Sequence, residues 1–133
     1  MKLVGIDYGT KRVGVAVTDV AGVLSFPKAV FPNDKQLLND LSTFIKKEEA
    51  EAIVIGESRN LTGEDNPVMK DIRTFARALE QECGLPVHFE PEFYTSHEAR
   101  RLAQDRVSKN AEDSVDAQAA AIFLNSYLSR STT

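Results

Sequence analysis

The sequence predicts an α/β fold: one mixed five-stranded sheet with helices on both faces. Three strand-like segments open the chain with short connections between them, so we expect them to pair antiparallel. Two further apolar segments each follow a helical pattern, and a helical crossover places a strand parallel to its partner. The 133 residues form one domain of ordinary size, in which we expect residues 129–133 to be a frayed tail.

The opening stretch, residues 3–18, organises this prediction. Its first strand is apolar and ends at Asp7, and its second strand, from residue 13, alternates valine with smaller residues. We expect Gly9 to adopt backbone angles that other residues avoid in the tight connection between them. A carboxylate at the inner end of a buried strand is costly unless a cation or hydrogen bonds compensate it, so Asp7 suggests a functional site.

The next elements follow from local patterns. A third strand is expected over residues 23–30, where Pro27 indicates an edge position or a bulge. Asn33 is expected to cap a helix, and a strand follows at residues 52–56. The apolar positions that predict this helix are Leu37, Leu38, Leu41, Phe44 and Ile45.

The second half repeats this alternation. We expect a polar loop over residues 57–66, then a helix capped by Asp65 or Asn66, with Pro67 in its first turn and Gly84 after its end. A fifth strand is predicted over residues 85–89. Two more helices are expected to begin at Thr95 and at Asp113 or Ser114. Ligand sites in such sheets lie at the carboxyl ends of strands, where Asp7, Glu57 and Glu92 fall.

Composition limits the class of protein. The net charge of −4 gives no global signature of a nucleic-acid binder, although a local basic patch can serve that purpose. Cys83 is the only cysteine, which excludes an intrachain disulfide and suits a reducing compartment. No apolar run reaches the length of a membrane span, and we see no signal peptide. We therefore expect a soluble, cytoplasmic protein with no membrane partner.

Several motifs point to one family. The stretch GIDYGTKRVGVAVTD, residues 5–19, resembles the opening motif of the YqgF-type family of pre-16S rRNA nucleases, in the ribonuclease H-like superfamily. That superfamily also contains Holliday-junction resolvases. Similarity to the family continues along nearly the whole chain, at Asn60-Leu61-Thr62-Gly63, at Glu92 with Thr95-Ser96, and at Asp116 with Ala119-Ala120.

The resemblance implies a ribonuclease H-like endonuclease that acts on structured RNA, with Asp7, Glu92 and Asp116 as its catalytic and metal-binding acids. Phosphodiester hydrolysis needs an activated water and a stabilised leaving oxygen, and Mg²⁺ or Mn²⁺ held by carboxylates supplies both. Basic residues are then expected to contact phosphates, although some of them can equally form an ordinary solvated face. These candidates are Lys11, Arg12, Arg100, Arg101, Arg106 and Lys109.

The chain departs from the family pattern near two of these acids. Ser58 stands in place of a proline after the fourth strand, and Pro91 and Phe93 stand where the family has aspartate and arginine on either side of Glu92. We hypothesise that Glu57 or Asp113 also joins the metal site as compensation. Asp113 lies three residues before Asp116, so both can project from one helical face.

Four readings of function remain open from the sequence. The first is an endonuclease in 5′-end processing of pre-16S rRNA, and the second is a Holliday-junction resolvase on branched DNA. The third is a catalytically silent RNA-binding module for ribosome assembly, which the departures around Glu92 favour. The fourth is an ATP-binding module of the actin-like type, for which the chain has the length of only one half. The protein is expected to be a monomer or a homodimer.

Overall fold

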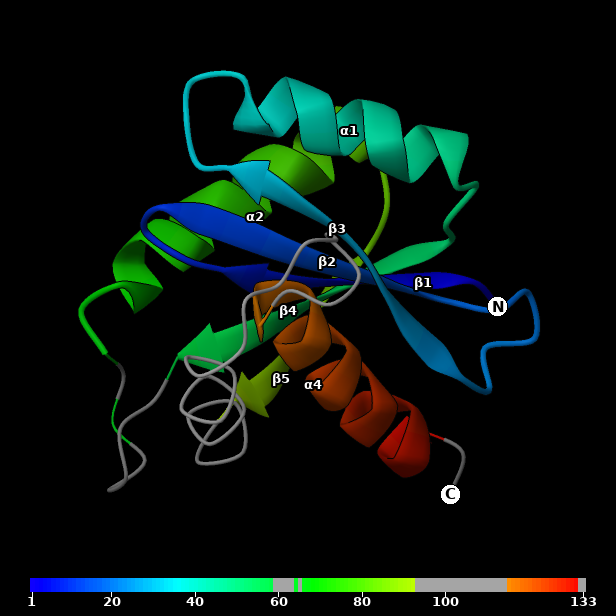
Figure 1. Cartoon of the computed structure of the whole chain (residues 1–133). Helices are drawn as coiled ribbons and strands as arrows, with labels where there is room; N and C mark the ends of the chain where they lie inside the picture. Colours follow the sequence, from blue (N-terminus) through cyan, green and yellow to red (C-terminus); the bar gives the residue numbers. More distant parts are fainter. Residues whose placement is uncertain (59–63, 65, 93–114, 132–133) are drawn as a thin grey trace.

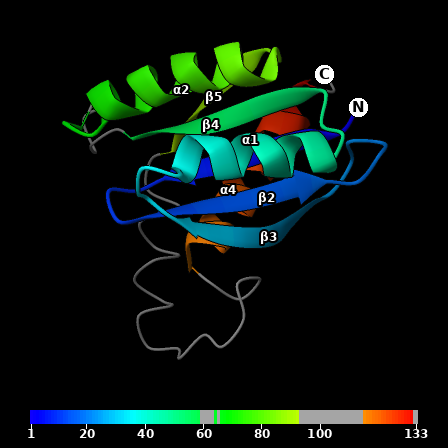
Figure 2. The same ribbon diagram turned by 90° about the horizontal axis from the view of Figure 1, so that it is seen from above.

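A computed structural model describes residues 1–58, 64, 66–92 and 115–131. It contains one five-stranded sheet in the order β3-β2-β1-β4-β5. Helices α1 (Leu37–Lys47) and α2 (Met69–Cys83) cover one face of the sheet, and α4 (Val115–Ser131) covers the other (Figure 1; Figure 2). The predicted mixed sheet with helices on both faces is confirmed.

The first three strands form an antiparallel unit, as expected. β1 (Leu3–Tyr8) pairs with β2 (Arg12–Thr18), and β2 pairs with β3 (Ser25–Pro32), which is the edge strand. The predicted edge position of Pro27 is confirmed, and the β2–β3 register also shifts between Val15 and Ala16, opposite the segment that contains Pro27.

The third strand begins two residues later than predicted. The Asp19 carboxylate accepts hydrogen bonds from the amides of Val23 and Leu24, at 2.8 and 3.3 Å, and thereby holds these residues in the preceding turn. These bonds lower the pKa of Asp19, because they stabilise its charged form.

The predicted cap of α1 is wrong. The helix begins after Gln36, and no side chain caps its first turn. The Asn33 side chain instead donates a 2.7 Å hydrogen bond to the carbonyl of Gly9, and the Asn33 amide donates to the carbonyl of Lys11 at 3.0 Å. Asn33 therefore ties the β3–α1 connection to the β1–β2 turn, a tertiary role that local sequence does not show.

The parallel half of the sheet is longer than predicted. β4 (Ala52–Ser58) pairs parallel with β1, and β5 (Val87–Glu92) pairs parallel with β4. Glu57 and Glu92 therefore lie within strands, although Glu57 was expected in a loop and the predicted fifth strand ended at residue 89. Gly84 ends α2 with φ 68°, as its position predicted.

The predicted cap of α2 by the Asn66 side chain is also wrong, and the alternative cap, Asp65, lies outside the described residues. Val68 precedes the helix and supplies no side-chain hydrogen bond. Asn66 instead donates through its side chain to the Ser58 hydroxyl at 2.9 Å, and its amide donates to the Ser58 carbonyl at 2.9 Å. Asn66 thus links the carboxyl end of β4 to the start of α2, because its carbonyl also accepts a 2.9 Å hydrogen bond from the amide of Met69.

Two apolar cores lie on the two faces of the sheet. On the first face, the valines of β2 and the isoleucines of β4 pack against α1 and α2. On the second face, Leu3, Ala16 and Val54 pack against α4. Alternate residues of each strand thus enter different cores, so strand position determines which face a side chain occupies.

The last helix begins at Val115, close to the predicted start, and continues to Ser131. It therefore includes residues 129–131, which the sequence analysis assigned to a frayed tail. None of the helices in the described part of the chain has the length and apolar character of a membrane span. The expected helix at Thr95 lies outside the described residues.

Candidate active site

The site begins at the carboxyl end of β1, where Asp7 is only 1% exposed. Asp7 lies directly across the ladder from Gly14 of β2. Gly5, two residues earlier on β1, faces Leu124 and Ala120 of α4. Because side chains two apart on a strand share a face, Asp7 also lies on the α4 face of the sheet.

Gly14 brings the start of α4 to this point. A Cβ atom on Gly14 would overlap the carbonyl group of Asp116 and would lie 2.6 Å from the amide nitrogen of Ala117. The helix backbone thus occupies the space where a side chain would stand directly opposite Asp7. Asp7 and Asp116, which are far apart in the sequence, are therefore neighbours in the fold.

Arg12 lies at the edge of this acidic pair. Its Nε is 3.3 Å from Oδ2 of Asp116, with side chains 71% and 16% exposed, respectively. The turn requires glycine at position 9. A Cβ there would lie 2.5 Å from the Arg12 carbonyl oxygen, which is too close for any other residue. The expectation of unusual backbone angles at Gly9 is wrong: close approach, rather than a positive φ, requires glycine.

The registers also place the two glutamates. Ile53 and Ile55 pack on the α1 and α2 face, so alternation along β4 places Glu57 on that face, opposite to Asp7. Glu92 pairs with Ser58, one residue further on, and so lies at a position of the α4 face. By register, the strand position of Glu92, but not that of Glu57, belongs to the face that carries Asp7.

Glu90 is a buried acid that the sequence analysis missed. Its side chain is 5% exposed and forms an ion pair with Arg130 near the end of α4. Burial raises the pKa of Glu90, and Arg130 opposes that rise. Alternation along β5 places Glu90 on the same face as His88, but only the structure shows that α4 covers this face, through the contact of His88 with Tyr127.

The donor set suits a hard cation. Asp7 and Asp116 contribute carboxylate oxygens, which Mg²⁺ and Mn²⁺ prefer. Within residues 1–58, 64, 66–92 and 115–131, no group of three or more metal-ligating side chains is present. Asp7 and Asp116 are the two predicted acids whose positions the β1–β2 ladder and the contact of α4 with Gly14 bring close together. The candidates Arg100, Arg101, Arg106, Lys109 and Asp113 lie outside the described residues.

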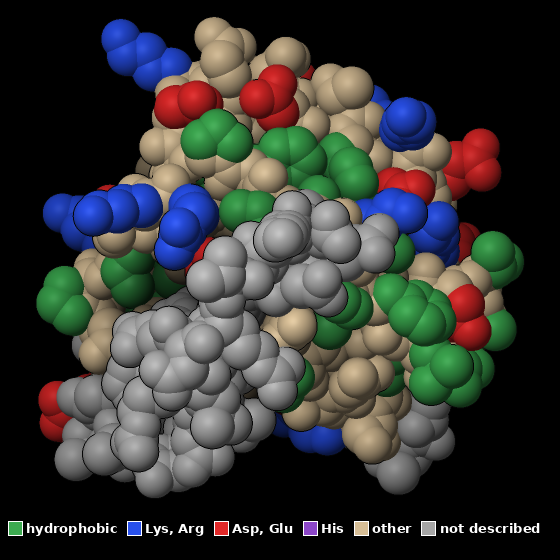
Figure 3. Space-filling view, in the orientation of Figure 1, with side chains coloured by type: hydrophobic (Ala, Val, Ile, Leu, Met, Phe, Trp, Pro, Cys, Tyr) green, Lys and Arg blue, Asp and Glu red, His purple; other side chains and the backbone are tan. Residues whose placement is uncertain are grey.

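A basic rim lies next to the acids. Lys11 and Arg12 are exposed on the β1–β2 turn, and Figure 3 shows Lys and Arg side chains over that turn. Lys35 is exposed on the β3–α1 connection, which Asn33 ties to the same turn. Local positive charge therefore exists in a protein whose net charge is −4.

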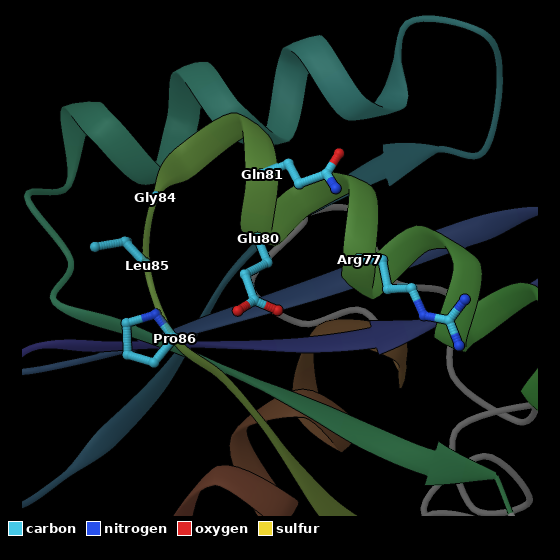
Figure 4. Close-up of a pocket in the computed structure, with 6 residues that line it drawn as sticks. All are labelled: Arg77, Glu80, Gln81, Gly84, Leu85 and Pro86. Atoms are coloured by element: carbon cyan, nitrogen blue, oxygen red, sulfur yellow. The ribbon is translucent and has the colours of Figure 1, made fainter.

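A groove of about 670 Å³ lies elsewhere, at the end of α2 and the entry to β5 (Figure 4). Because β5 begins there, the groove is at the opposite end of the parallel strands from Asp7. It therefore belongs to a separate part of the surface. Its lining residues are Arg77, Glu80, Gln81, Gly84, Leu85 and Pro86.

Comparison with known proteins identifies the family. The sequence pattern of RuvX, described as a Holliday junction resolvase, matches residues 1–130. The chain belongs to the RuvX family. A relative in Nitratidesulfovibrio vulgaris is 36% identical over 132 residues, covering 96% of this chain and 93% of its own. A relative in Moorella thermoacetica is 34% identical over 137 residues, covering 98% and 96%. Both relatives are named as pre-16S rRNA nucleases.

Solved structures confirm the fold of this RuvX-family chain. Thermus thermophilus RuvC in complex with a Holliday junction superposes with a TM-score of 0.59 and 18% identity, over 99% of this chain and 96% of that one. Fowlpox virus resolvase with junction DNA gives a TM-score of 0.60 and 11% identity over the whole of both chains. At these identities the likeness concerns the ribonuclease H-like resolvase fold alone.

Proposed function

We propose that this RuvX-family protein is a divalent-metal-dependent endonuclease that cleaves structured RNA. The observation that carries the proposal is the close packing of Asp116 on Gly14, directly opposite the buried Asp7. The names of the relatives support pre-16S rRNA as the substrate. Processing of its 5′ end, in the cytoplasm, is the reaction that we propose.

Asp7 and Asp116 hold the metal in this proposal, and Glu92 is the third acid. Mg²⁺ or Mn²⁺ bound there lowers the pKa of water and stabilises charge on phosphate oxygens. The chain itself fixes the ligands: β1 buries Asp7, and the contact of α4 with Gly14 fixes Asp116. The negative charges of Asp7 and Asp116 attract a cation but repel the phosphate of the substrate. Substrate binding at the site therefore requires that a bound cation neutralises these charges.

Lys11 and Arg12 bind the substrate backbone in this proposal. They lie on the exposed turn beside Asp7 and Asp116, where positive charge attracts phosphates and orients the strand. Such contacts carry no base sequence information, so recognition of a particular RNA depends on its shape as well. Arg100, Arg101, Arg106 and Lys109 remain proposed substrate contacts.

Branched DNA is the second candidate substrate. The family description is Holliday junction resolvase, and both junction-bound structures reported above share the fold. Resolution of a symmetric junction requires two strand cuts, for which a homodimer provides two sites. Cleavage at one position of an RNA needs only one active site. The DNA junction therefore requires a homodimer, whereas the RNA does not.

Cleavage with matched substrates tests this proposal. Wild type, Asp7→Asn and Asp116→Asn are incubated with a 5′-extended 16S rRNA precursor and with a four-way DNA junction, in Mg²⁺ or Mn²⁺. Asp71→Asn is the matched control, because Asp71 is an exposed acid on α2. We expect wild type and the control to cut the RNA, both site variants to lose at least about 100-fold in rate, and chelation to stop cleavage.

Three results would contradict parts of the proposal. Junction cleavage with intact RNA would establish the resolvase reading. Metal-independent cleavage by Asp7→Asn would remove the acidic centre. RNA binding by all variants without cleavage would support a silent assembly module, in which Ser58 and the residues around Glu92 have replaced the family's active pattern.

A further inference from the structure

The ion pair between Arg12 and Asp116 has consequences for metal binding. The guanidinium Nε lies 3.3 Å from Oδ2 of Asp116, one of the oxygens that the proposed function assigns to a metal. A guanidinium and a divalent cation both require the negative charge of this carboxylate. Occupation by one therefore weakens binding of the other.

The two partners differ in their freedom to move. Asp116 is 16% exposed and is fixed by the contact of its backbone with Gly14. Arg12 is 71% exposed at the start of β2, so its long side chain can turn away without disturbing a core. If a cation replaces the guanidinium at the Asp116 carboxylate, Arg12 is therefore the residue that moves.

We propose that Arg12 is an internal counter-ion of Asp116 which leaves this carboxylate before a divalent cation binds, and which then contacts a substrate phosphate. The inference rests on the proposed function, since it requires that Asp116 binds a metal. It assigns Arg12 a positioning role that Lys11, its neighbour on the same turn, does not share. Metal and RNA then bind cooperatively, because release of Arg12 by one favours the other.

Isothermal titration with MnCl₂ tests the first part. Wild type, Arg12→Gln, Lys11→Gln and Asp116→Asn are compared, with thermal unfolding to verify that each is folded. An exposed ion pair of this kind corresponds to about a two- to five-fold change in affinity. We expect Arg12→Gln to lower the Mn²⁺ Kd by that factor relative to Lys11→Gln, and Asp116→Asn to raise it strongly.

Equal Mn²⁺ affinity in Arg12→Gln and Lys11→Gln would overturn the proposal, because loss of a nearby positive charge alone would then explain any gain. The proposed metal centre would survive that result. Absence of Mn²⁺ binding in both wild type and Arg12→Gln would overturn the metal centre together with the role of Arg12. The two failures are thus distinguishable.

RNA binding in EDTA tests the second part without metal or cleavage. Asp116→Asn releases Arg12, so it should bind the 5′-extended precursor more tightly than wild type. The same change should give a smaller gain in an Arg12→Gln background, whereas a Lys11→Gln background should retain the gain. An equal gain in all three backgrounds would show general electrostatics and would overturn the release of Arg12 to phosphate.

Discussion

Replacement of Gly14 by alanine tests how the site is assembled. The new Cβ would overlap the Asp116 carbonyl and lie 2.6 Å from the Ala117 nitrogen, whereas ordinary contact begins near 3.4 Å. The Ala117 contact alone therefore requires the start of α4 to move by about 0.8 Å, and the overlap with the Asp116 carbonyl requires a larger movement. The helix resists this movement, because it packs on the sheet through Leu124 and accepts a 2.7 Å hydrogen bond from Ser25 at Ala121.

The expected effects are large for the addition of one methyl group. Overpacking of this kind costs about 1–3 kcal/mol of unfolding free energy, which lowers Tm by roughly 4–12 °C in a domain of this size. Displacement of a reactive group by about 1 Å can cost about 100-fold in rate. Gly14→Ala should therefore lose most RNA cleavage even at temperatures where it remains folded.

Gly5→Ala is the matched control on the same face of the sheet. Its Cβ would lie 3.1 Å from a Leu124 methyl group, 3.2 Å from the Leu124 Cβ and 3.3 Å from the Ala120 carbonyl oxygen, so small shifts of a few tenths of an ångström accommodate it. We expect a cost of about 1 kcal/mol or less and nearly unchanged cleavage. Thermal unfolding and single-turnover cleavage measure both variants. If Gly14→Ala has the same Tm and the same cleavage rate as Gly5→Ala, the start of α4 does not pack against Gly14 as described.

Three further predictions concern charged side chains. Burial raises the pKa of Glu90 above its usual 4.5, so the folded state binds the carboxyl proton more tightly than the unfolded state does. Wild type should therefore lose stability relative to Glu90→Gln as the pH rises above 4.5. Urea unfolding at several pH values measures this, and a stability difference that does not change with pH would refute it. Arg130→Gln should cost about 1–3 kcal/mol at pH 7 by removing the partner of buried Glu90, and a similar cost in the Glu90→Gln background would exclude this cause. Lys11→Gln should weaken RNA binding and reduce the slope of log affinity against log salt by roughly 0.7, whereas an unchanged slope would exclude a phosphate contact.

The strand and helix order could be predicted from local patterns. Alternation of apolar residues identified β2, and helical spacing identified α1 and α2. The helical pattern suffices because α1 and α2 each bury one face. The β2 pattern suffices because its valines fill one core while the smaller Gly14 and Ala16 lie against α4. Boundaries and caps were less predictable, since the Asn33 side chain binds the Gly9 carbonyl and the Asn66 side chain binds the Ser58 hydroxyl instead of capping a helix.

The sequence by itself determined the fold class and the family, and it made Asp7, Glu92 and Asp116 the candidate acids. Only the tertiary structure decided that Asp7 and Asp116 lie close together, because glycine at position 14 lets the α4 backbone approach β2. Tertiary structure also decided that Arg12 pairs with Asp116 and that Glu90 is buried with Arg130. Each contact joins residues from separate elements, and the distance between two elements depends on packing across the whole sheet, which no local pattern records.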